Sequence, residues 1–152
     1  MTDKLGLDSF VPYRLSVVSN LVSDVIAQSY DRLFNISIAQ WRVIAVVGEA
    51  GRLTPQAIGA RTRMDKMTVS RAVKPLIERR LLAREDNADD GRSHLLSLTD
   101  TGARLYADVV PAARAFEAQM LADFAPAEVA ALMCALDRLE AAAARLEMPH
   151  DS

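Results

Sequence analysis

One segment of this 152-residue chain, residues 54–98, constrains the fold more than any other, because its local signals follow a fixed order. Thr54 and Pro55 mark the start of a short helix that reaches about Arg61, since threonine caps helices and proline is tolerated at the first helical position. After a brief turn, Asp65 can cap a second helix. The segment therefore predicts two helices joined by a tight turn.

The second helix has one apolar face and one polar face. Its expected inner residues recur at helical spacing: Val69, Val73, Leu76 and Ile77. Pro75 lies within this helix, where it removes one hydrogen bond and is expected to kink the helix or limit its regularity. The outward face then consists of Lys66, Met67, Ser70, Arg71 and Lys74, with Thr68 near the boundary.

A β-hairpin is predicted directly after these two helices. Residues 82–85 form its first strand, residues 86–91 have the Asp, Asn and Gly content of a turn, and residues 92–98 form the returning strand. A two-stranded ribbon is marginal alone and needs a helix beneath it. Two short helices, a tight turn and a hairpin together indicate a winged helix-turn-helix, whose second helix enters the DNA major groove.

Longer helices are expected on both sides of this lobe, which spans about residues 38–98. The helix at residues 11–34 is apolar over so wide an arc that we expect it to pack against partners on two sides. A helix at residues 38–49 follows, with Ser37 as a plausible cap and Gly51 just past its end.

After the hairpin, Thr99 is expected to cap a helix that reaches about Phe124 and is bent by Pro111. The last helix starts at Pro126, and its apolar residues are spaced 3, 4, 3, 4 and 3 apart, which is typical of a helix that packs lengthwise on another. This seam consists of Val129, Leu132, Leu136, Leu139, Ala143 and Leu146. The seam and the wide first helix favour dimerisation over packing within the chain.

The expected fold class is therefore mainly α with a small β-hairpin. We expect a single domain over residues 1–148, with residues 11–34 and 99–147 as N- and C-terminal dimerisation helices and a tail at residues 149–152.

Charge is unevenly distributed along the chain. Nine basic residues and two acidic ones lie between Arg52 and Arg84, so this block carries +7, whereas the whole chain carries −2. A basic block in an acidic chain indicates a surface for a polyanion, and a solvated face without function is the alternative. The nine are Arg52, Arg61, Arg63, Lys66, Arg71, Lys74, Arg79, Arg80 and Arg84.

The outward face of the second helix has side chains suited to reading DNA. Arg71 can donate two hydrogen bonds to guanine, and Ser70 can contact either base type. The methyl groups of Met67 and Thr68 can touch the methyl group of thymine. Further polar or basic side chains suit phosphate contacts: Lys66, Lys74, Thr54 and Gln56.

Other classes of function lack their sequence features. The chain has no Gly-rich phosphate loop and no nucleophile elbow, and its one cysteine and two histidines suggest no zinc site, so we expect no enzyme, cofactor or metal. The chain has no run of about 18 apolar residues, so we expect no membrane span. The N-terminus lacks a secretory signal and Cys134 can form no internal disulfide, so we expect a cytoplasmic protein. We interpret Cys134 as a packing residue beside the seam.

The stretch DKMTVSRAVKPLIERRLLAREDNADDGRSHLLSLTDTG, residues 65–102, resembles the recognition helix and wing of the MarR family of bacterial transcription regulators. Asp90, Arg92 and the pair Leu98–Thr99 have the spacing of the family's wing signature. WRVIAVVGEAGRLTPQAIGARTRM, residues 41–64, is similar to the second and third helices of that family. Arg80 departs from the pattern, because glycine often precedes the wing strand, and it is either an added phosphate contact or a tolerated surface residue.

The resemblance implies roles for several residues. In that family the recognition helix enters the major groove, the wing arginine reaches the minor groove or phosphates, and the first and last helices of two chains build a dimer. Carried over, Arg92 is the wing contact and Asp90 its support. Many members respond to small phenolic or other lipophilic effectors bound between the dimer helices and the DNA-binding lobe. Tyr13, Arg14, Trp41 and Arg42 are candidates for that site; core or interface positions for Tyr13 and Trp41 are the alternative.

We therefore expect a sequence-specific DNA-binding transcription regulator, namely a ligand-responsive homodimeric repressor that binds a pseudo-palindromic operator in double-stranded DNA. One alternative is a ligand-binding or protein-interaction module of the same fold that does not read DNA, and another is a nonspecific architectural DNA binder. The salt dependence of duplex binding and the preference for an operator separate the three. The operator, the regulated genes, the effector and the direction of regulation are not contained in the sequence.

Overall fold

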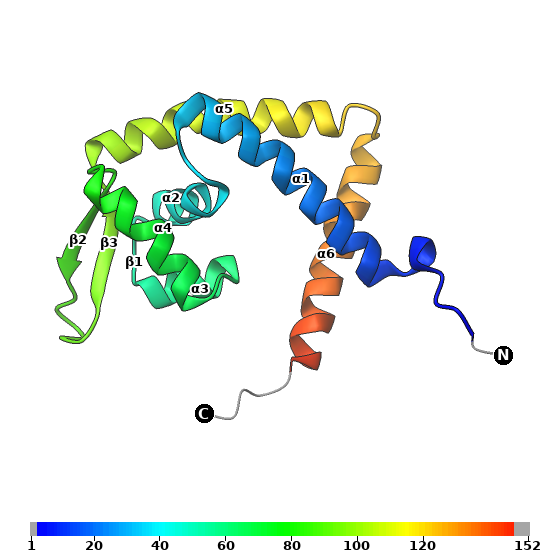
Figure 1. Ribbon diagram of the computed structural model, residues 1–152, viewed down its shortest axis with the longest axis horizontal. Helices are drawn as coiled ribbons and strands as arrows, with labels where there is room; N and C mark the ends of the chain where they lie inside the picture. The colour runs from blue at the N-terminus through cyan, green and yellow to red at the C-terminus, as the bar shows by residue number, and fades with distance from the viewer. Residues whose placement is uncertain (1–2, 148–152) are drawn as a thin grey trace. The chain divides into compact units, whose positions relative to one another are not determined.

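The computed structural model of the protein describes residues 3–147, so the expected tail at 149–152 lies outside the described residues. The chain divides into two compact units, one ending at Val110 and the other beginning at Pro111, and α5 contributes to both. The elements follow one another in the order η1 (Leu7–Ser9), α1 (Val11–Phe34), α2 (Ile38–Ala50), β1 (Arg52–Leu53), α3 (Pro55–Thr62), α4 (Lys66–Glu78), β2 (Leu82–Asp86), β3 (His94–Leu98), α5 (Asp100–Met120) and α6 (Pro126–Leu146), as Figure 1 shows.

Helix α2 begins and ends as its sequence predicts. The Ser37 hydroxyl accepts a hydrogen bond from the Gln40 N–H at 3.1 Å, and the Gln40 side chain accepts one from the Ser37 N–H at 2.9 Å. This reciprocal pair is a capping box, which satisfies two donors that the first turn leaves open. Gly51 follows the helix with a φ of 86°, a conformation that glycine adopts at little cost.

The two short helices of the predicted helix-turn-helix are also present. The Thr54 side chain accepts a hydrogen bond from the Ala57 N–H at 3.1 Å and caps α3. The Asp65 carboxylate accepts one from the Thr68 N–H at 2.8 Å and caps α4. Pro75 lies inside α4, and the helix ends three residues later at Glu78.

The predicted hairpin is confirmed as β2 and β3, and a third strand joins it. The antiparallel sheet has the order β1-β3-β2, with Leu82 opposite Leu98 and Leu53 opposite Leu96. Strand β1 was not predicted, because a two-residue strand is too short to show an alternating pattern. The returning strand begins at His94 rather than Arg92, since Arg92 belongs to the turn.

One apolar core lies between α2, α3, α4 and the sheet. It explains the hydrophobic spacing of α4, whose buried residues are Val69, Ala72, Val73 and Leu76. Ile77, which was also expected to face inward, is partly buried against this core. The core residues are Val43, Ile44, Val47, Leu53, Ile58, Val69, Ala72, Val73, Leu76, Leu81, Leu82 and Leu96.

Helix α5 is shorter than predicted. Its N-cap is the expected Thr99, whose hydroxyl accepts a hydrogen bond from the Gly102 N–H at 3.0 Å. Its C-terminus is Met120 rather than Phe124, because residues 121–124 form turns with bonds such as Phe124 N–H to Leu121 C=O at 3.0 Å. Pro126 then restricts the preceding residue to extended backbone, so the chain cannot pass into α6 without a break.

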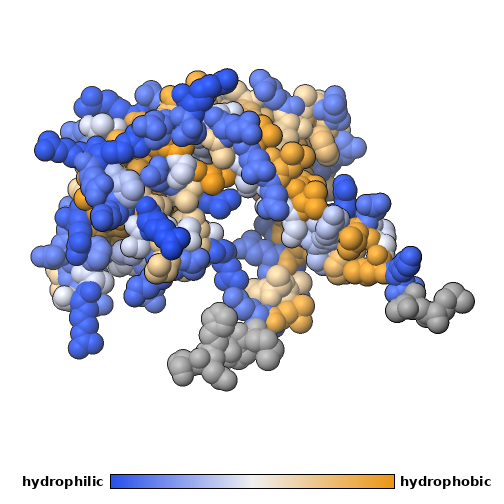
Figure 2. Space-filling model, in the orientation of Figure 1, coloured by the Kyte–Doolittle hydropathy of each residue, from blue (hydrophilic) through white to orange (hydrophobic). Residues whose placement is uncertain are grey.

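The apolar faces of the flanking helices remain exposed within the chain. In α1 the only buried residue is Tyr30, and in α6 no described residue is buried. Figure 2 shows apolar side chains gathered over the N-terminal half of α1. The exposed apolar residues of the two helices are Val11, Tyr13, Leu15, Val17, Val18, Leu21, Val25 and Leu33 in α1, and Leu132, Met133, Leu136, Leu139 and Leu146 in α6.

Candidate nucleic-acid interface

The outward face of α4 is basic and polar, as the sequence predicts. While Val69, Ala72, Val73 and Leu76 point into the core, the side chains between them reach solvent. Met67 has 62% of its surface exposed, which is unusual for a large apolar side chain and leaves it available for a partner. The exposed residues of this face are Lys66, Met67, Ser70, Arg71 and Lys74, and none of them is acidic.

Thr68 lies at the boundary of this face and has a structural role. Its hydroxyl donates to the Asp65 carboxylate at 2.9 Å, and its backbone N–H donates to the same carboxylate at 2.8 Å. These hydrogen bonds hold the pKa of Asp65 below its ordinary value, because they favour the charged carboxylate. Thr68 therefore has its O–H committed to the helix cap, and its methyl group is what it can offer to a base.

At the start of α3, Thr54 and Gln56 lie where phosphate contacts were predicted. The Thr54 oxygen accepts the Ala57 N–H, while its own O–H has no partner among the described residues and can donate outward. Gln56 is exposed in the first turn of the same helix. The N-terminus of a helix also favours anionic groups through its unpaired N–H groups.

The hairpin turn is ordered by its own side chains. The Asn87 side chain accepts the Asp89 N–H at 3.2 Å and donates to the Ser93 hydroxyl at 2.9 Å. The Asp90 carboxylate accepts the Arg92 N–H at 3.0 Å. Asp90 thus contacts the backbone of Arg92, not its guanidinium. That guanidinium is exposed and has no hydrogen-bond or ion-pair partner among residues 3–147.

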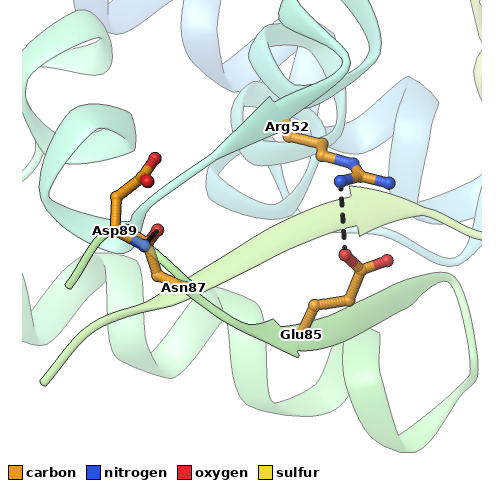
Figure 3. Close-up of polar contacts among 4 residues, drawn as sticks. All are labelled: Arg52, Glu85, Asn87 and Asp89. Atoms are coloured by element: carbon orange, nitrogen blue, oxygen red, sulfur yellow. Dashed lines mark hydrogen bonds and ion pairs between the residues drawn. The ribbon is translucent and has the colours of Figure 1, made fainter. Parts of the chain in front are cut away.

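Two residues of the basic block are held by contacts within the chain. Arg52 forms an ion pair with Glu85 at 3.5 Å, and Figure 3 shows the two side chains reaching toward each other, with Asn87 and Asp89 farther along toward the turn. Because both side chains are about half exposed or more, this pair contributes about 0–1 kcal/mol. Arg79 donates from Nη1 to the backbone carbonyl of Asn35 at 2.7 Å.

The residues considered for an effector site do not lie together within one chain. Trp41 is partly buried and stacks on Tyr106 with ring centroids 5.9 Å apart, and it also meets Tyr30 edge-on at 5.7 Å. Tyr13 lies on the same helix as Tyr30 but 17 residues earlier, about 25 Å along its axis. Arg14 and Arg42 are exposed. Trp41 thus packs against two tyrosine rings within the chain, and its role in an effector site stays a prediction.

The sequence did not single out three residues that organise this surface. Asn87 could have been found, since asparagine at the start of a turn commonly bonds the backbone two residues later. Arg79 was predicted only as part of the basic block, and its contact with Asn35 gave no signal because the two residues are 44 positions apart. Gly102 gave none either, although a Cβ built there would lie 2.0 Å from the carbonyl oxygen of Leu81.

The remaining candidates are quickly placed. Cys134 is an exposed free thiol on α6 within the single chain, and its predicted packing beside the seam stays a prediction. Among residues 3–147, no three potential metal ligands of the His, Cys, Asp or Glu type cluster together. Within the same range, no helix has the length and hydropathy needed to span a bilayer.

Comparison with known proteins agrees with this architecture. The model of the MarR family matches residues 34–93, which include α2 to α4, strand β2 and the hairpin turn but not strand β3. A MarR/EmrR family transcriptional regulator from Acinetobacter sp. ADP1 is 27% identical, with a TM-score of 0.86 over 93% of this chain and 99% of that one. A probable transcriptional regulator from Pseudomonas aeruginosa is 28% identical, with a TM-score of 0.77 over 88% and 98%.

A third structure shares the fold and contains DNA. It is a mutant MarR from E. coli complexed with operator DNA, 22% identical, with a TM-score of 0.78 over 90% of this chain and 99% of that one. The search of curated proteins gave no match.

The arrangement of α2, α3, α4 and the three-stranded sheet defines a winged helix protein, with the long helix α1 before this lobe in the chain and the long helices α5 and α6 after it. Together with the family match over residues 34–93 and the likeness along nearly the whole chain, it makes this chain similar to the MarR family of transcription regulators.

Proposed function

We propose that the protein is a homodimeric, sequence-specific DNA-binding regulator that acts in the cytoplasm and represses transcription from a pseudo-palindromic operator. The observation that carries the proposal is the exposed face of α4, which presents Lys66, Met67, Ser70, Arg71 and Lys74 and contains no acidic side chain of its own. In the same compact unit, an ordered turn presents the unpaired guanidinium of Arg92. Such a surface suits a duplex because a helix enters the major groove while basic side chains contact phosphates.

In this proposal the residues divide into three tasks. Arg71, Ser70 and the methyl groups of Met67 and Thr68 read base edges. Arg92 contacts the backbone or minor groove, and Asp90 supports it by holding the turn. Phosphate contacts position the lobe on the duplex and come from Lys66, Lys74, Thr54 and Gln56.

The homodimer sets the length of the site. Two recognition helices related by a twofold axis would enter successive major grooves, about 34 Å apart. A phenolic or other lipophilic effector would weaken DNA binding if it bound better to a dimer with another spacing, which is a shift of population. Tyr13, Arg14, Trp41 and Arg42 remain the proposed effector residues. Because Tyr13 and Trp41 lie far apart in one chain, a common site would have to include both protomers.

The test begins with selection of duplexes from a random pool, followed by fluorescence anisotropy on the selected and a scrambled duplex. Arg71→Ala should weaken binding to the selected duplex by about 1–3 kcal/mol and relax sequence preference. Arg92→Ala should weaken binding to both duplexes alike. Arg138→Ala, on α6 outside the lobe, is the matched control and should change neither.

Three outcomes would contradict the proposal. Equal affinity of the wild type and both variants would show that the assigned surface does not contact DNA. Negligible duplex binding at low salt would favour a module that does not read DNA, since a DNA reader binds more tightly as salt falls. Binding without preference for any selected sequence would favour a nonspecific architectural role.

A further inference from the structure

The C-terminal end of α4 is a closed and regular structure. The N–H of Leu81 bonds to the Leu76 carbonyl at 2.9 Å, and the N–H of Arg80 bonds to the Ile77 carbonyl at 2.9 Å. With Arg80 at a φ of 57°, this is the Schellman motif, which satisfies the last carbonyls of a helix. The end of α4 therefore moves as one body with the rest of the helix.

This end is fastened to α5 through the backbone. The hydroxyl of Thr99 donates to the Arg80 carbonyl, and the N–H of Thr99 donates to the Leu81 carbonyl at 3.2 Å. Gly102 lies against the same Leu81 carbonyl, where no side chain would fit. No single side chain can be removed to release this contact without also removing the cap of α5.

A single side chain also connects the C-terminal end of α4 to the C-terminal end of α1. The Arg79 guanidinium donates from Nη1 to the Asn35 carbonyl at 2.7 Å, a distance typical of charge-assisted hydrogen bonds. Asn35 is the left-handed cap of α1, with a φ of 52°, and its N–H bonds to the Asp31 carbonyl at 3.0 Å. The last residues of two helices are thus joined directly.

Arg79 is poorly placed to read DNA. It is the C-cap residue of α4, eight residues beyond Arg71, so it lies about 12 Å farther along the helix axis. One of its guanidinium N–H groups already donates to the Asn35 carbonyl. The charge that made Arg79 part of the basic block therefore serves a contact within the chain.

We propose that Arg79 is a positioning residue for DNA recognition: its hydrogen bond to Asn35 couples the direction of α4 to that of α1, the first of the two expected dimerisation helices. The DNA consequence rests on the proposed function. The coupling of α4 to α1 does not, because both helices belong to the same compact unit. A movement of α1 would then be transmitted through Arg79 to α4 and would change the position of its exposed face.

The first arm of the test needs no DNA. Spin labels are placed at Gln28→Cys on α1 and Ser70→Cys on α4 in a Cys134→Ala background, and labelled chain is diluted with unlabelled chain so that distances within one chain dominate. Arg79→Met should broaden or shift the distance distribution relative to the parent. Arg79→Lys keeps a donor and should restore it. Arg80→Asn is the matched control, because it removes a neighbouring charge, tolerates the positive φ and should leave the distribution unchanged.

The second arm measures duplex affinity against salt. Arg79→Met should weaken operator binding about 3- to 10-fold, the size expected when coupling is lost without loss of a contact. The slope of log K against log salt should stay that of the wild type, whereas loss of a phosphate contact would reduce it by about 1. A urea midpoint for each variant confirms that the fold is retained.

The outcomes separate cleanly. A distance distribution of Arg79→Met equal to that of the parent overturns the proposal, and so does a reduced salt slope, which would make Arg79 a phosphate contact. If the wild type binds no duplex at all, the proposed function fails while the spin-label distances still decide whether Arg79 couples the two helices.

Discussion

Arg80 adopts a backbone conformation that is costly for a residue with a side chain. Its φ of 57° places it in the left-handed region, which the end of α4 requires for the Schellman motif. Glycine, which the resembling family was expected to have here, would adopt this conformation without that cost. The arginine side chain itself makes no hydrogen bond or ion pair within residues 3–147.

Arg80→Gly should therefore stabilise the protein. The left-handed conformation costs an ordinary residue about 1–2 kcal/mol. Glycine avoids this cost but loses more backbone entropy on folding, so we expect the free energy of unfolding to rise by up to about 1 kcal/mol. The measurement is a urea titration in which the midpoint rises at constant slope. Arg61→Gly, inside α3, is the control and should lose about 1 kcal/mol. A midpoint for Arg80→Gly equal to or below that of the wild type would contradict the reading.

Asp65 should contribute to the acid sensitivity of the fold. Hydrogen bonds from Thr68 lower its pKa in the folded state, so its contribution to stability is present above the unfolded pKa of about 3.9. That contribution is lost as the pH falls through the lower folded value. Asp65→Asn keeps a capping side chain that does not titrate.

The comparison is made by urea unfolding of both proteins at pH values from about 6 down to about 2.5. The variant should lose less stability than the wild type below about pH 4. Parallel curves over this range would show that the Asp65 cap does not respond to pH.

Among the elements, α5 depends most on one close approach. Its N-terminal turn reaches the end of α4 because Gly102 has no side chain, and the Leu81 carbonyl occupies the space that a Cβ would take. Backbone cannot yield as the end of a flexible side chain can. The ends of α4 and β3 and the starts of β2 and α5 therefore share one junction at Arg80, Leu81, Thr99 and Gly102.

Gly102→Ala should destabilise the protein by about 3 kcal/mol, the upper range for forcing extra volume into a packed site. Gly91→Ala is the matched control, because a Cβ there meets nothing within 4 Å, and it should change stability by less than about 0.5 kcal/mol. Thermal and urea unfolding of the two variants give the answer. Equal stability of both variants would mean that the junction relaxes freely.

At the scale of the whole molecule, α1 and α6 each expose an apolar face, which would be stabilised by packing against a partner. A single chain leaves Leu21 64% exposed and Leu136 39% exposed, and such positions recur along both helices. Contiguous apolar surface of this kind usually marks an interface. The seam predicted from the spacing of α6 is therefore available to a second copy of the chain, as in the proposed homodimer.

We expect the wild type to sediment as a dimer and Leu136→Arg to shift it toward monomer, because a charge on the seam would be buried without a partner. Arg138→Gln, an exposed change on the same helix, is the control. Duplex affinity should fall with the loss of the dimer, since one lobe then binds a half-site alone. A wild type that sediments as a monomer at all concentrations would contradict the expectation.

The helices and their caps could be predicted from the sequence because their signals are local. Ser37, Thr54, Asp65 and Thr99 each bond a backbone N–H three residues away, and the apolar spacing of α4 follows from the helical period. The hairpin was predicted for the same reason, from a turn-forming composition between two short apolar runs. The outward face of α4, with its candidate reading residues, then follows by exclusion from the buried face.

Only the tertiary structure decided which of the basic residues remain available. Arg52 is paired with Glu85 and Arg79 with the Asn35 carbonyl, and neither partner can be recognised from spacing along the chain. Strand β1 and the close approach at Gly102 likewise depend on segments brought together by folding. Helix caps and turns depend on residues that are close in the sequence. Contacts between residues 19 or 44 positions apart form only when the core packs and brings the helix ends together.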